Sequence, residues 1–327
     1  MRLLSRFAPH TLSLAVGLAI ALPAAVAQPA DAWPDHQIQV IVPYTPAGST
    51  DAVTRIVMQK LAERLGQPIV VENRPGANSL VGTAQAARAK PDGYTFVTVL
   101  AAYTVNPHLY PLQYKQEDFT PVSHLADLPL FLFVNRNLPV NSVNDLIEYG
   151  RKNPGKLTYA SSGTGSSAHM TGANFALVNG LEMTHIPYKG SAPILTDLLG
   201  GQLSMVFDPA IVPMPYAKKG ELKVLGLASA ERWQVAPEVP TLVEQGVKDF
   251  VMNSWVGLLA PAGTPQPIVD RMSRELAEVV KDPDVRQRFA NAGFVPRGST
   301  PAEFGALIEK DLARYGEIVK ATGTKVE

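Results

Sequence analysis

The chain has 327 residues, enough for about two domains with cores of their own. Lysine plus arginine equals aspartate plus glutamate at 29 each, so no net charge draws the protein to nucleic acid or to an anionic membrane. Cysteine is absent, which excludes disulfides, thiolate metal sites, cysteine nucleophiles and a lipid anchor on cysteine. The six histidines include no His-x-x-x-His pair, so we expect no metal site, and nothing in the pattern calls for a cofactor.

The N-terminus has the pattern of a cleavable signal peptide. Arg2 and Arg6 precede an apolar run over residues 11–22, and Ala25-Val26-Ala27 supplies the small residues that a signal peptidase reads. We expect cleavage after Ala27, so that residues 1–27 are a signal peptide of an exported protein. The run is shorter than the roughly 20 residues of a membrane span, and it lacks the amphipathic period of a buried helix.

From residue 37 onward the pattern alternates between strands and helices. The predicted strands lie at residues 37–42, 68–72, 94–100, 130–134, 157–160, 183–187, 203–208, 224–228 and 255–259. The predicted helices lie from about 49 to 65, at 80–89 and 142–152, from about 167 to 179, at 192–199 and 265–281, and from Thr300 onward. Thr300 and Glu303 form a capping box at the start of the last helix.

This alternation predicts an α/β fold with mainly parallel sheets covered by helices. The strands at 130–134 and 255–259 have no helical partner of their own, so we interpret them as segments that cross between domains. The first domain is then discontinuous, with residues 28–128 plus 252–327, and residues 129–251 form a second domain inserted into it. The two crossing segments would act as a hinge.

Two loops join a strand's carboxyl end to the start of a helix and are the candidates for a binding site. They are Pro43–Asp51 and Ser161–Ser167. Free backbone amides and the positive end of the helix dipole meet at such a place, glycine lets a ligand approach the backbone, and Ser and Thr add hydroxyls. The pattern is that of an anion site without a cation. The alternative is that both loops are ordinary helix caps and tight turns.

Other motifs in the same region suggest catalysis or nucleotide binding more weakly. Gly163-x-Gly165-x-x-Ala168 resembles a dinucleotide fingerprint, but an exported protein meets little dinucleotide. Ser162, His169 and Asp208 could be a hydrolytic triad, yet no Gly-x-Ser-x-Gly elbow is present. Packing in the first turn of a helix is the simpler role for His169.

Three further residues follow predicted strands and are weaker candidates for the same cleft. Tyr188 and Gly190 lie in a turn after the strand at 183–187, where a packing aromatic is the alternative. Asp208 ends an apolar strand, where a carboxylate can orient a water, accept a hydrogen bond from a ligand or cap the next segment.

Several motifs, taken in this order, resemble those of the Bug family, the extracytoplasmic solute receptors of tripartite tricarboxylate transporters. They cover the whole mature chain and are Pro43–Asp51, Val71–Ala77, Pro91–Tyr94, His185–Gly190, Leu198–Gly201 and Trp255–Pro265. The resemblance implies a two-domain, hinge-closing periplasmic binding fold of the Venus-flytrap kind. It also implies a small carboxylate held by amides and hydroxyls of the two loops, and a periplasmic location.

Ligand-binding positions follow from this resemblance residue by residue. In the first loop they are Tyr44, Ala47, Gly48, Ser49, Thr50 and Asp51, and in the second Ser161, Ser162, Gly163, Thr164 and Ser167, while Asp208 falls where the family has a ligand-facing acid. Ala47 stands where the family commonly has glycine, which adds a methyl group beside the expected carboxylate.

The functional hypothesis is therefore a periplasmic receptor, not an enzyme, that binds an organic carboxylate and delivers it to a tripartite-type membrane transporter. The ligand would be a dicarboxylate, a tricarboxylate or an aromatic carboxylate, and the receptor a monomer that binds no nucleic acid. The alternatives are an exported α/β hydrolase that uses Ser162 and His169, and a sensor subunit that presents its ligand to a signalling partner. Without residues 1–27 the chain has 27 basic and 29 acidic residues, so anion binding must come from local amides and hydroxyls.

Overall fold

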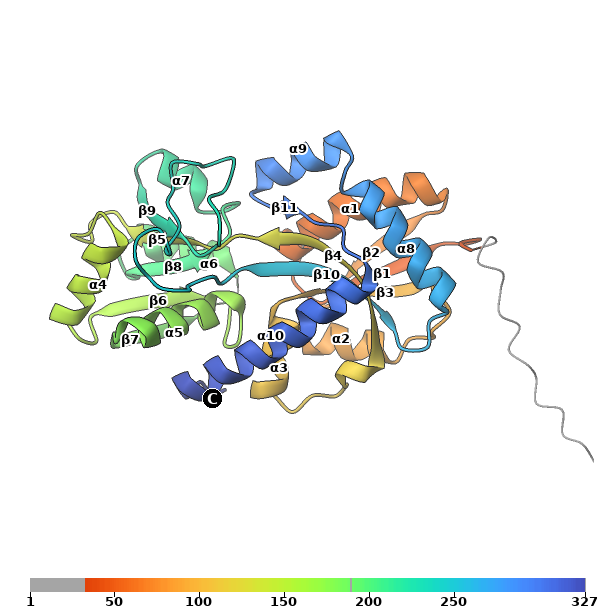
Figure 1. Cartoon of the computed structure of the whole chain (residues 1–327), viewed down its shortest axis with the longest axis horizontal. Coiled ribbons are helices and arrows are strands. Elements are labelled where there is room, and N and C mark those ends of the chain that lie inside the picture. The colour runs from red at the N-terminus through yellow and green to blue at the C-terminus, as the bar shows by residue number, and fades with distance from the viewer. Residues whose placement is uncertain (1–32, 189, 327) are drawn as a thin grey trace, which may run out of the picture.

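The computed structural model describes residues 33–188 and 190–326, and shows two helix-covered sheets that lie side by side (Figure 1). The predicted signal peptide and its cleavage after Ala27 lie outside the described residues. Within them, no helix is both long and apolar enough to cross a membrane.

The first sheet has six strands in the order β11-β4-β10-β3-β1-β2. Its strands are β1 (Ile38–Val42), β2 (Ile69–Asn73), β3 (Thr95–Leu100), β4 (Phe119–Leu128), β10 (Ser254–Pro261) and β11 (Val295–Pro296). We call each sheet together with its helices one half of the molecule. The helices of the first half are α1 (Ser49–Leu65), α2 (Leu80–Ala87), α3 (Ala102–Leu109), the 3-10 turn η2 (Gln116–Asp118), α8 (Gln266–Val279), α9 (Pro283–Ala292) and α10 (Pro301–Thr322). β1 pairs in parallel with β2 and β3, whereas β10 is antiparallel to β3 and β4.

The second sheet has five strands in the order β7-β6-β8-β5-β9. Its strands are β5 (Phe131–Asn135), β6 (Leu157–Ser161), β7 (Met183–Pro187), β8 (Met205–Asp208) and β9 (Leu222–Leu227), and its helices are α4 (Val143–Lys152), α5 (Ser167–Asn179), α6 (Ser191–Leu199) and α7 (Met214–Lys218). β6 pairs in parallel with β7 and β8, while β5 is antiparallel to β8 and β9. The predicted α/β class is confirmed, with mixed sheets because the strands next to the chain crossings run antiparallel.

The chain passes between the two sheets twice. It leaves β4 and enters β5 across Pro129 and Leu130, and it returns after Met252 and Asn253 into β10. The predicted strand at 130–134 is thus part of the second sheet and the one at 255–259 part of the first. Ser254 pairs with Leu128, so the two crossings lie next to each other.

Local sequence signals explain several helix ends. Thr300 accepts from the amide of Glu303, whose carboxylate accepts in turn from the amide of Thr300, so the predicted capping box is confirmed. Gly66, at φ 67°, ends α1 in the left-handed conformation that glycine adopts without strain.

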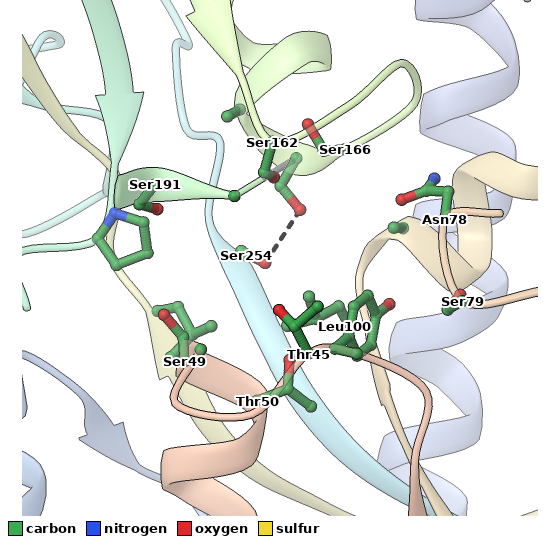
Figure 2. Close-up of a pocket in the computed structure, with 18 of the residues that line it drawn as sticks. Thr45, Ser49, Thr50, Asn78, Ser79, Leu100, Ser162, Ser166, Ser191 and Ser254 are labelled. Carbon is green, nitrogen blue, oxygen red and sulfur yellow. Dashed lines mark hydrogen bonds between the residues drawn. The ribbon is translucent and has the colours of Figure 1, made fainter. Parts of the chain in front are cut away.

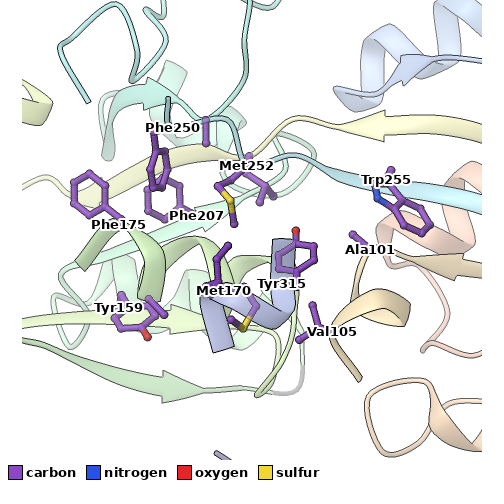
Figure 3. Close-up of a cluster of buried hydrophobic side chains, with 14 of the residues drawn as sticks. Ala101, Val105, Tyr159, Met170, Phe175, Phe207, Phe250, Met252, Trp255 and Tyr315 are labelled. Atoms are coloured by element: carbon purple, nitrogen blue, oxygen red, sulfur yellow. The ribbon is translucent and has the colours of Figure 1, made fainter. Parts of the chain in front are cut away.

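The C-terminal helix α10 packs on both halves. Figure 3 shows Tyr315 of α10 near Met170 of α5 and Val105 of α3, in a buried cluster that includes residues of both sheets. The indole Nε1 of Trp255 in β10 donates to Asp311 Oδ2 at 2.7 Å, which fixes α10 to the strand that follows the second crossing. Each half also has a buried cluster of its own.

Candidate functional site

A cavity of about 530 Å³ lies between the two halves, beside the chain crossings. Figure 2 shows hydroxyl groups from both halves facing it, with Thr45, Ser49 and Thr50 opposite Ser162 and Ser166. The full lining is Pro43, Tyr44, Thr45, Gly48, Ser49, Thr50, Pro75, Gly76, Ala77, Asn78, Ser79, Leu100, Ala102, Leu128, Leu130, Ser162, Ser166, Ser167, Ala168, Gly190, Ser191, Asp208, Pro209 and Ser254.

The first loop, between β1 and α1, brings a helix start to the cavity. Gly48 is the N-cap of α1 and, having no side chain, leaves the amides of the first turn uncapped. Gly48, Ser49 and Thr50 line the cavity, whereas Ala47 does not. Ala47 has a φ of 63°, a conformation that costs an alanine more than it would cost a glycine.

Asp51 belongs to the framework of this loop and does not line the cavity. Its carboxylate accepts from the Ala47 amide at 3.0 Å, from Arg55 Nε at 2.9 and 3.0 Å, and from Asn73 Nδ2 at 2.9 Å. Burial raises the pKa of Asp51, but these hydrogen bonds outweigh it and hold the pKa below its usual range. Because these donors engage both oxygens of the carboxylate, Asp51 is held toward its own loop and toward β2, and not toward the cavity.

The second loop, between β6 and α5, brings a second helix start from the other half. Gly163 at φ 130° and Gly165 at φ 80° allow its tight path. Ser166 caps α5 by accepting from the amide of His169. Ser162, Ser166 and Ser167 line the cavity, and Ser167 Oγ donates to Ser254 Oγ of β10 at 2.9 Å.

Two stacked histidines brace the second loop from behind. The rings of His169 and His185 lie 3.7 Å apart at 11°. His169 Nδ1 accepts from the amide of Gly165 at 3.1 Å, and His185 Nε2 is 2.7 Å from Ser161 Oγ, which itself donates to the Gly163 carbonyl. Ser161 and His169 therefore shape the loop and do not line the cavity, and neither do Gly163 and Thr164.

This bracing also bears on the hydrolase alternative. Burial and the neighbouring His185 lower the pKa of His169 to about 3, and burial lowers that of His185 to about 4. His169 uses Nδ1 to bind the loop, and no hydrogen bond among the described residues joins it to Ser162 or Asp208. The geometry of a catalytic triad is not formed.

The segment around β7 and β8 contributes only part of what was predicted. Tyr188 does not line the cavity, because its hydroxyl donates to Asp197 at 2.6 Å on α6. Gly190, at φ 108°, and Asp208 do line it. Asp208 accepts from Ser191 Oγ at 3.0 Å, and burial raises its pKa to about 7, a rise that the Ser191 hydrogen bond partly offsets.

Sequence reasoning missed a third segment, between β2 and α2. Gly76, Ala77, Asn78 and Ser79 line the cavity, and the last three all have positive φ, at 45°, 48° and 78°. Positive φ at three consecutive residues other than glycine costs conformational energy, so it occurs where the surrounding structure holds the backbone in place. Asn106 does so here, since its side chain bonds both the side chain and the carbonyl of Asn78.

The inner wall of the cavity was also missed and is largely apolar. Leu100, Leu128 and Leu130 form part of it, together with Tyr44, which the sequence did predict. The Tyr44 hydroxyl is shielded from solvent, and its burial raises the pKa of Tyr44 to about 12, a rise that Ser79 and the backbone of Leu100 partly offset. Apolar strand residues give no sign in the sequence that one face of them will border a ligand.

Residues alternate between two sides at the chain crossings. Leu128, Leu130 and Ser254 face the cavity, whereas Asp127, Pro129 and Asn253 line a second cleft of about 690 Å³ on the opposite side. The period of two along an extended chain produces this alternation.

The chemistry of the cavity lining suits an anion with an apolar body. Hydroxyls and helix-start amides come from both halves, Asp208 is the one carboxylate in the lining, and the described lining contains no Lys, Arg or His. Among the described residues, no group of three or more His, Cys, Asp or Glu could hold a metal ion.

Comparisons with known proteins agree on one family. A family model described as tripartite tricarboxylate transporter family receptor matches residues 53–324. The chain is 36% identical to protein BugT of Bordetella pertussis over 318 residues, covering 95% of this chain and 97% of BugT. The solved structure of R. palustris Rpa4515 with adipate is similar with a TM-score of 0.83 at 33% identity, over 90% of this chain and 99% of that one. MatC from Rhodopseudomonas palustris with bound malate gives 0.79 at 29% identity, over 88% and 100%.

Proposed function

The chain belongs to the tripartite tricarboxylate transporter receptor family, whose members are periplasmic solute-binding receptors and not enzymes, and we propose that it captures a small organic carboxylate in the cavity between its halves. Its fold is the two-domain fold of periplasmic binding proteins, as predicted. The single observation that carries the proposal is the pair of helix starts, one from each half, that face one cavity.

Both halves contribute groups that bind the ligand. The ligand's carboxylate accepts from amides and hydroxyls of Ser49, Thr50 and Ser162 and from the amide of Ser167, whose hydroxyl donates to Ser254. The carbon body of the ligand lies against the apolar inner wall. The bound adipate and malate of the two similar structures are both dicarboxylates, which supports a di- or tricarboxylate, while the leucine-lined wall also accommodates an aromatic body. Ala47, Asp51, Ser161, Gly163, Thr164, His169 and Tyr188 contribute by holding the loops.

The remaining parts of the proposal concern export of the receptor, its domains and delivery of the ligand. Residues 1–27 direct export and are removed, and the mature monomer has domains of residues 28–128 plus 252–327 and of 129–251. These close about the two crossings. The closed, loaded receptor delivers its ligand to membrane subunits of the tripartite type.

The proposal is tested by binding a panel of aliphatic and aromatic mono-, di- and tricarboxylates, measured by calorimetry. We expect micromolar or tighter binding, about −8 kcal/mol or more, of at least one panel member without chemical change of the ligand. Ser162→Ala should weaken it about tenfold by removing a donor, and Gly48→Val should weaken it more by filling space beside the first helix start.

Both substitutions leave the backbone unstrained. Gly48 has a φ of −78°, and a Cβ there meets its nearest atom, the Thr45 carbonyl oxygen, at 3.5 Å. Unchanged affinity in both variants would remove the proposed site, and consumption of a bound compound would favour the hydrolase. Capture of a sensor protein in place of transporter subunits from membrane extract would favour the signalling role.

A further inference from the structure

The tip of the second loop touches the opposite half of the molecule. The Tyr110 hydroxyl, just after α3, donates to the Thr164 carbonyl at 3.0 Å. Tyr110 belongs to the first half and does not line the cavity, whereas Ser162 and Ser166 of the same loop do. A side chain outside the binding cavity therefore holds a loop that forms one of its walls.

Gly165 shows how closely this tip approaches. A Cβ at Gly165 would lie 2.9 Å from Leu109 Cδ1 and 3.3 Å from Asn78 Nδ2, both in the first half. Its φ of 80° also favours glycine. The Gly165 amide is already bound to His169 Nδ1, so the tip is fixed from its own half as well.

Hydrogen bonds within the first half hold the surface that receives the tip. Asn78 Nδ2 donates to Asn106 Oδ1 at 2.8 Å, and Asn106 Nδ2 donates to the Asn78 carbonyl at 3.0 Å. Asn106 is fully buried in α3, the helix that also carries Leu109. The tip thus docks on a surface of Asn78, Leu109 and Tyr110, and we call this set of contacts the latch.

We propose that the latch holds the two halves closed around a bound ligand, so that Tyr110 is a positioning residue for ligand retention. This rests on the proposed function only for the identity of the ligand. If the halves separate about the chain crossings, the Tyr110–Thr164 hydrogen bond and the Gly165–Leu109 contact break together, because their partners belong to different halves. Both contacts therefore stabilise the closed state relative to the open one.

Tyr110→Phe tests the hydrogen bond. We expect the dissociation rate of a bound carboxylate to rise about 2- to 10-fold, with the association rate and the ranking of ligands unchanged. Tyr149→Phe is the control, since Tyr149 is a half-buried tyrosine on α4 whose hydroxyl bonds nothing in the described part of the chain. If Tyr110 only supports the fold, Tyr110→Phe will lower the melting temperature and leave the dissociation rate unaltered. That result would overturn the proposal.

A distance measurement tests the latch without any ligand. The sequence has no cysteine, so Val81→Cys on α2 and Val178→Cys on α5, at side chains 54% and 52% exposed, give a specific spin-label pair across the halves. Tyr110→Phe and Gly165→Ala should each lengthen the label distance in the ligand-free protein, and Leu109→Ala should shorten it again in the Gly165→Ala background.

Gly180→Ala is the control for backbone strain, because Gly180 has a φ of 64° and a Cβ there meets nothing within 4 Å. Distances unchanged by Tyr110→Phe and Gly165→Ala would refute the latch even if carboxylates bind. Failure of every carboxylate to bind, with the distance shifts present, would refute the ligand assignment alone.

Discussion

Asp208 is the one acidic or basic residue in the described lining of the cavity. It is 8% exposed, its carboxylate accepts a single hydrogen bond from the described residues, that of Ser191, and burial raises its pKa to about 7. The group therefore changes charge near neutral pH inside a site proposed for anions. An ionised Asp208 repels a bound carboxylate, whereas a protonated one can donate a hydrogen bond to it.

We expect affinity for a carboxylate to fall as pH rises from 6 to 8, by about tenfold for each unit by which ligand raises the pKa of Asp208. Asp208→Asn should flatten this dependence. Ser191→Ala should move the fall to higher pH, because Ser191 stabilises the ionised form. Calorimetry across this pH range measures the effect, and parallel curves for wild type and Asp208→Asn would contradict it.

Stability supplies a second readout that needs no ligand. A carboxyl with a pKa of 3.8 unfolded and about 7 folded costs stability as pH rises from about 4 to 7, since the unfolded state loses its proton first. Asp208→Asn should therefore be more stable than wild type at pH 8, and this gain should vanish near pH 3.5.

At the scale of elements, the two loops differ in how they are held. A carboxylate, Asp51, fixes the first loop, while the neutral pair of His169 and His185 braces the second. Both histidines have pKa values well below the usual 6.5, so they stay uncharged in the folded protein at moderately acidic pH. Protonating either ring would place a charge against the other ring in a stack of which His169 is buried and His185 half-buried.

His185→Gln should reduce the acid sensitivity of folding. A histidine with a lowered folded pKa contributes stability that is lost as pH falls below 6.5, by about 1.4 kcal/mol per pH unit, because the unfolded state gains the proton first. Denaturant titrations from pH 6.5 to 4.5 measure how the free energy of unfolding depends on pH. The slope of this dependence should be shallower for the variant by the equivalent of about one proton. Asp208 has the opposite slope in this range, so the test is the difference between variant and wild type, and equal slopes would contradict it.

Elements with a local signal were predicted, and those without one were missed. The Thr300–Glu303 capping box and the helix starts after β1 and β6 depend on neighbours in sequence, which makes them visible there. β4 was missed because Pro121 interrupts it, and its pairing with β10 contains register shifts. α3 has a proline within it, at Pro107.

At the scale of the whole molecule, α10 packs on both halves of the chain. It contacts α3 and α5 (Figure 1). Asp311 on α10 is 4% exposed, accepts a hydrogen bond from the indole of Trp255 and lies 3.3 Å from Arg314. Movement about the chain crossings must therefore keep or slide this packing. The latch lies beside this shared core, because Leu109 also packs against the cluster that contains Tyr315.

Trp255→Phe should lower the free energy of unfolding by about 2–4 kcal/mol, because it removes a donor from a buried carboxylate and leaves a cavity. Trp233→Phe is the matched control, since Trp233 is half-buried and its indole has no hydrogen-bond partner in the described chain; we expect a loss below about 1 kcal/mol. Urea titration measures both. Two separate unfolding transitions in wild type would show that α10 does not couple the halves.

The sequence by itself determined the α/β class, the order of most elements, the family and the two helix starts that face the cavity, because these depend on periodicity and on residues adjacent in the chain. Only the tertiary structure decided which side of each loop faces the ligand. Asp51 and Ser161 satisfy loop amides and histidine nitrogens, while Asn78, Leu130 and Ser254 reach the cavity from distant positions. A hydrogen bond depends on the direction in which its donor points. Because this protein is proposed to bind anions through amides and hydroxyls, and not through a basic patch, the residues that donate can be identified only in the folded structure.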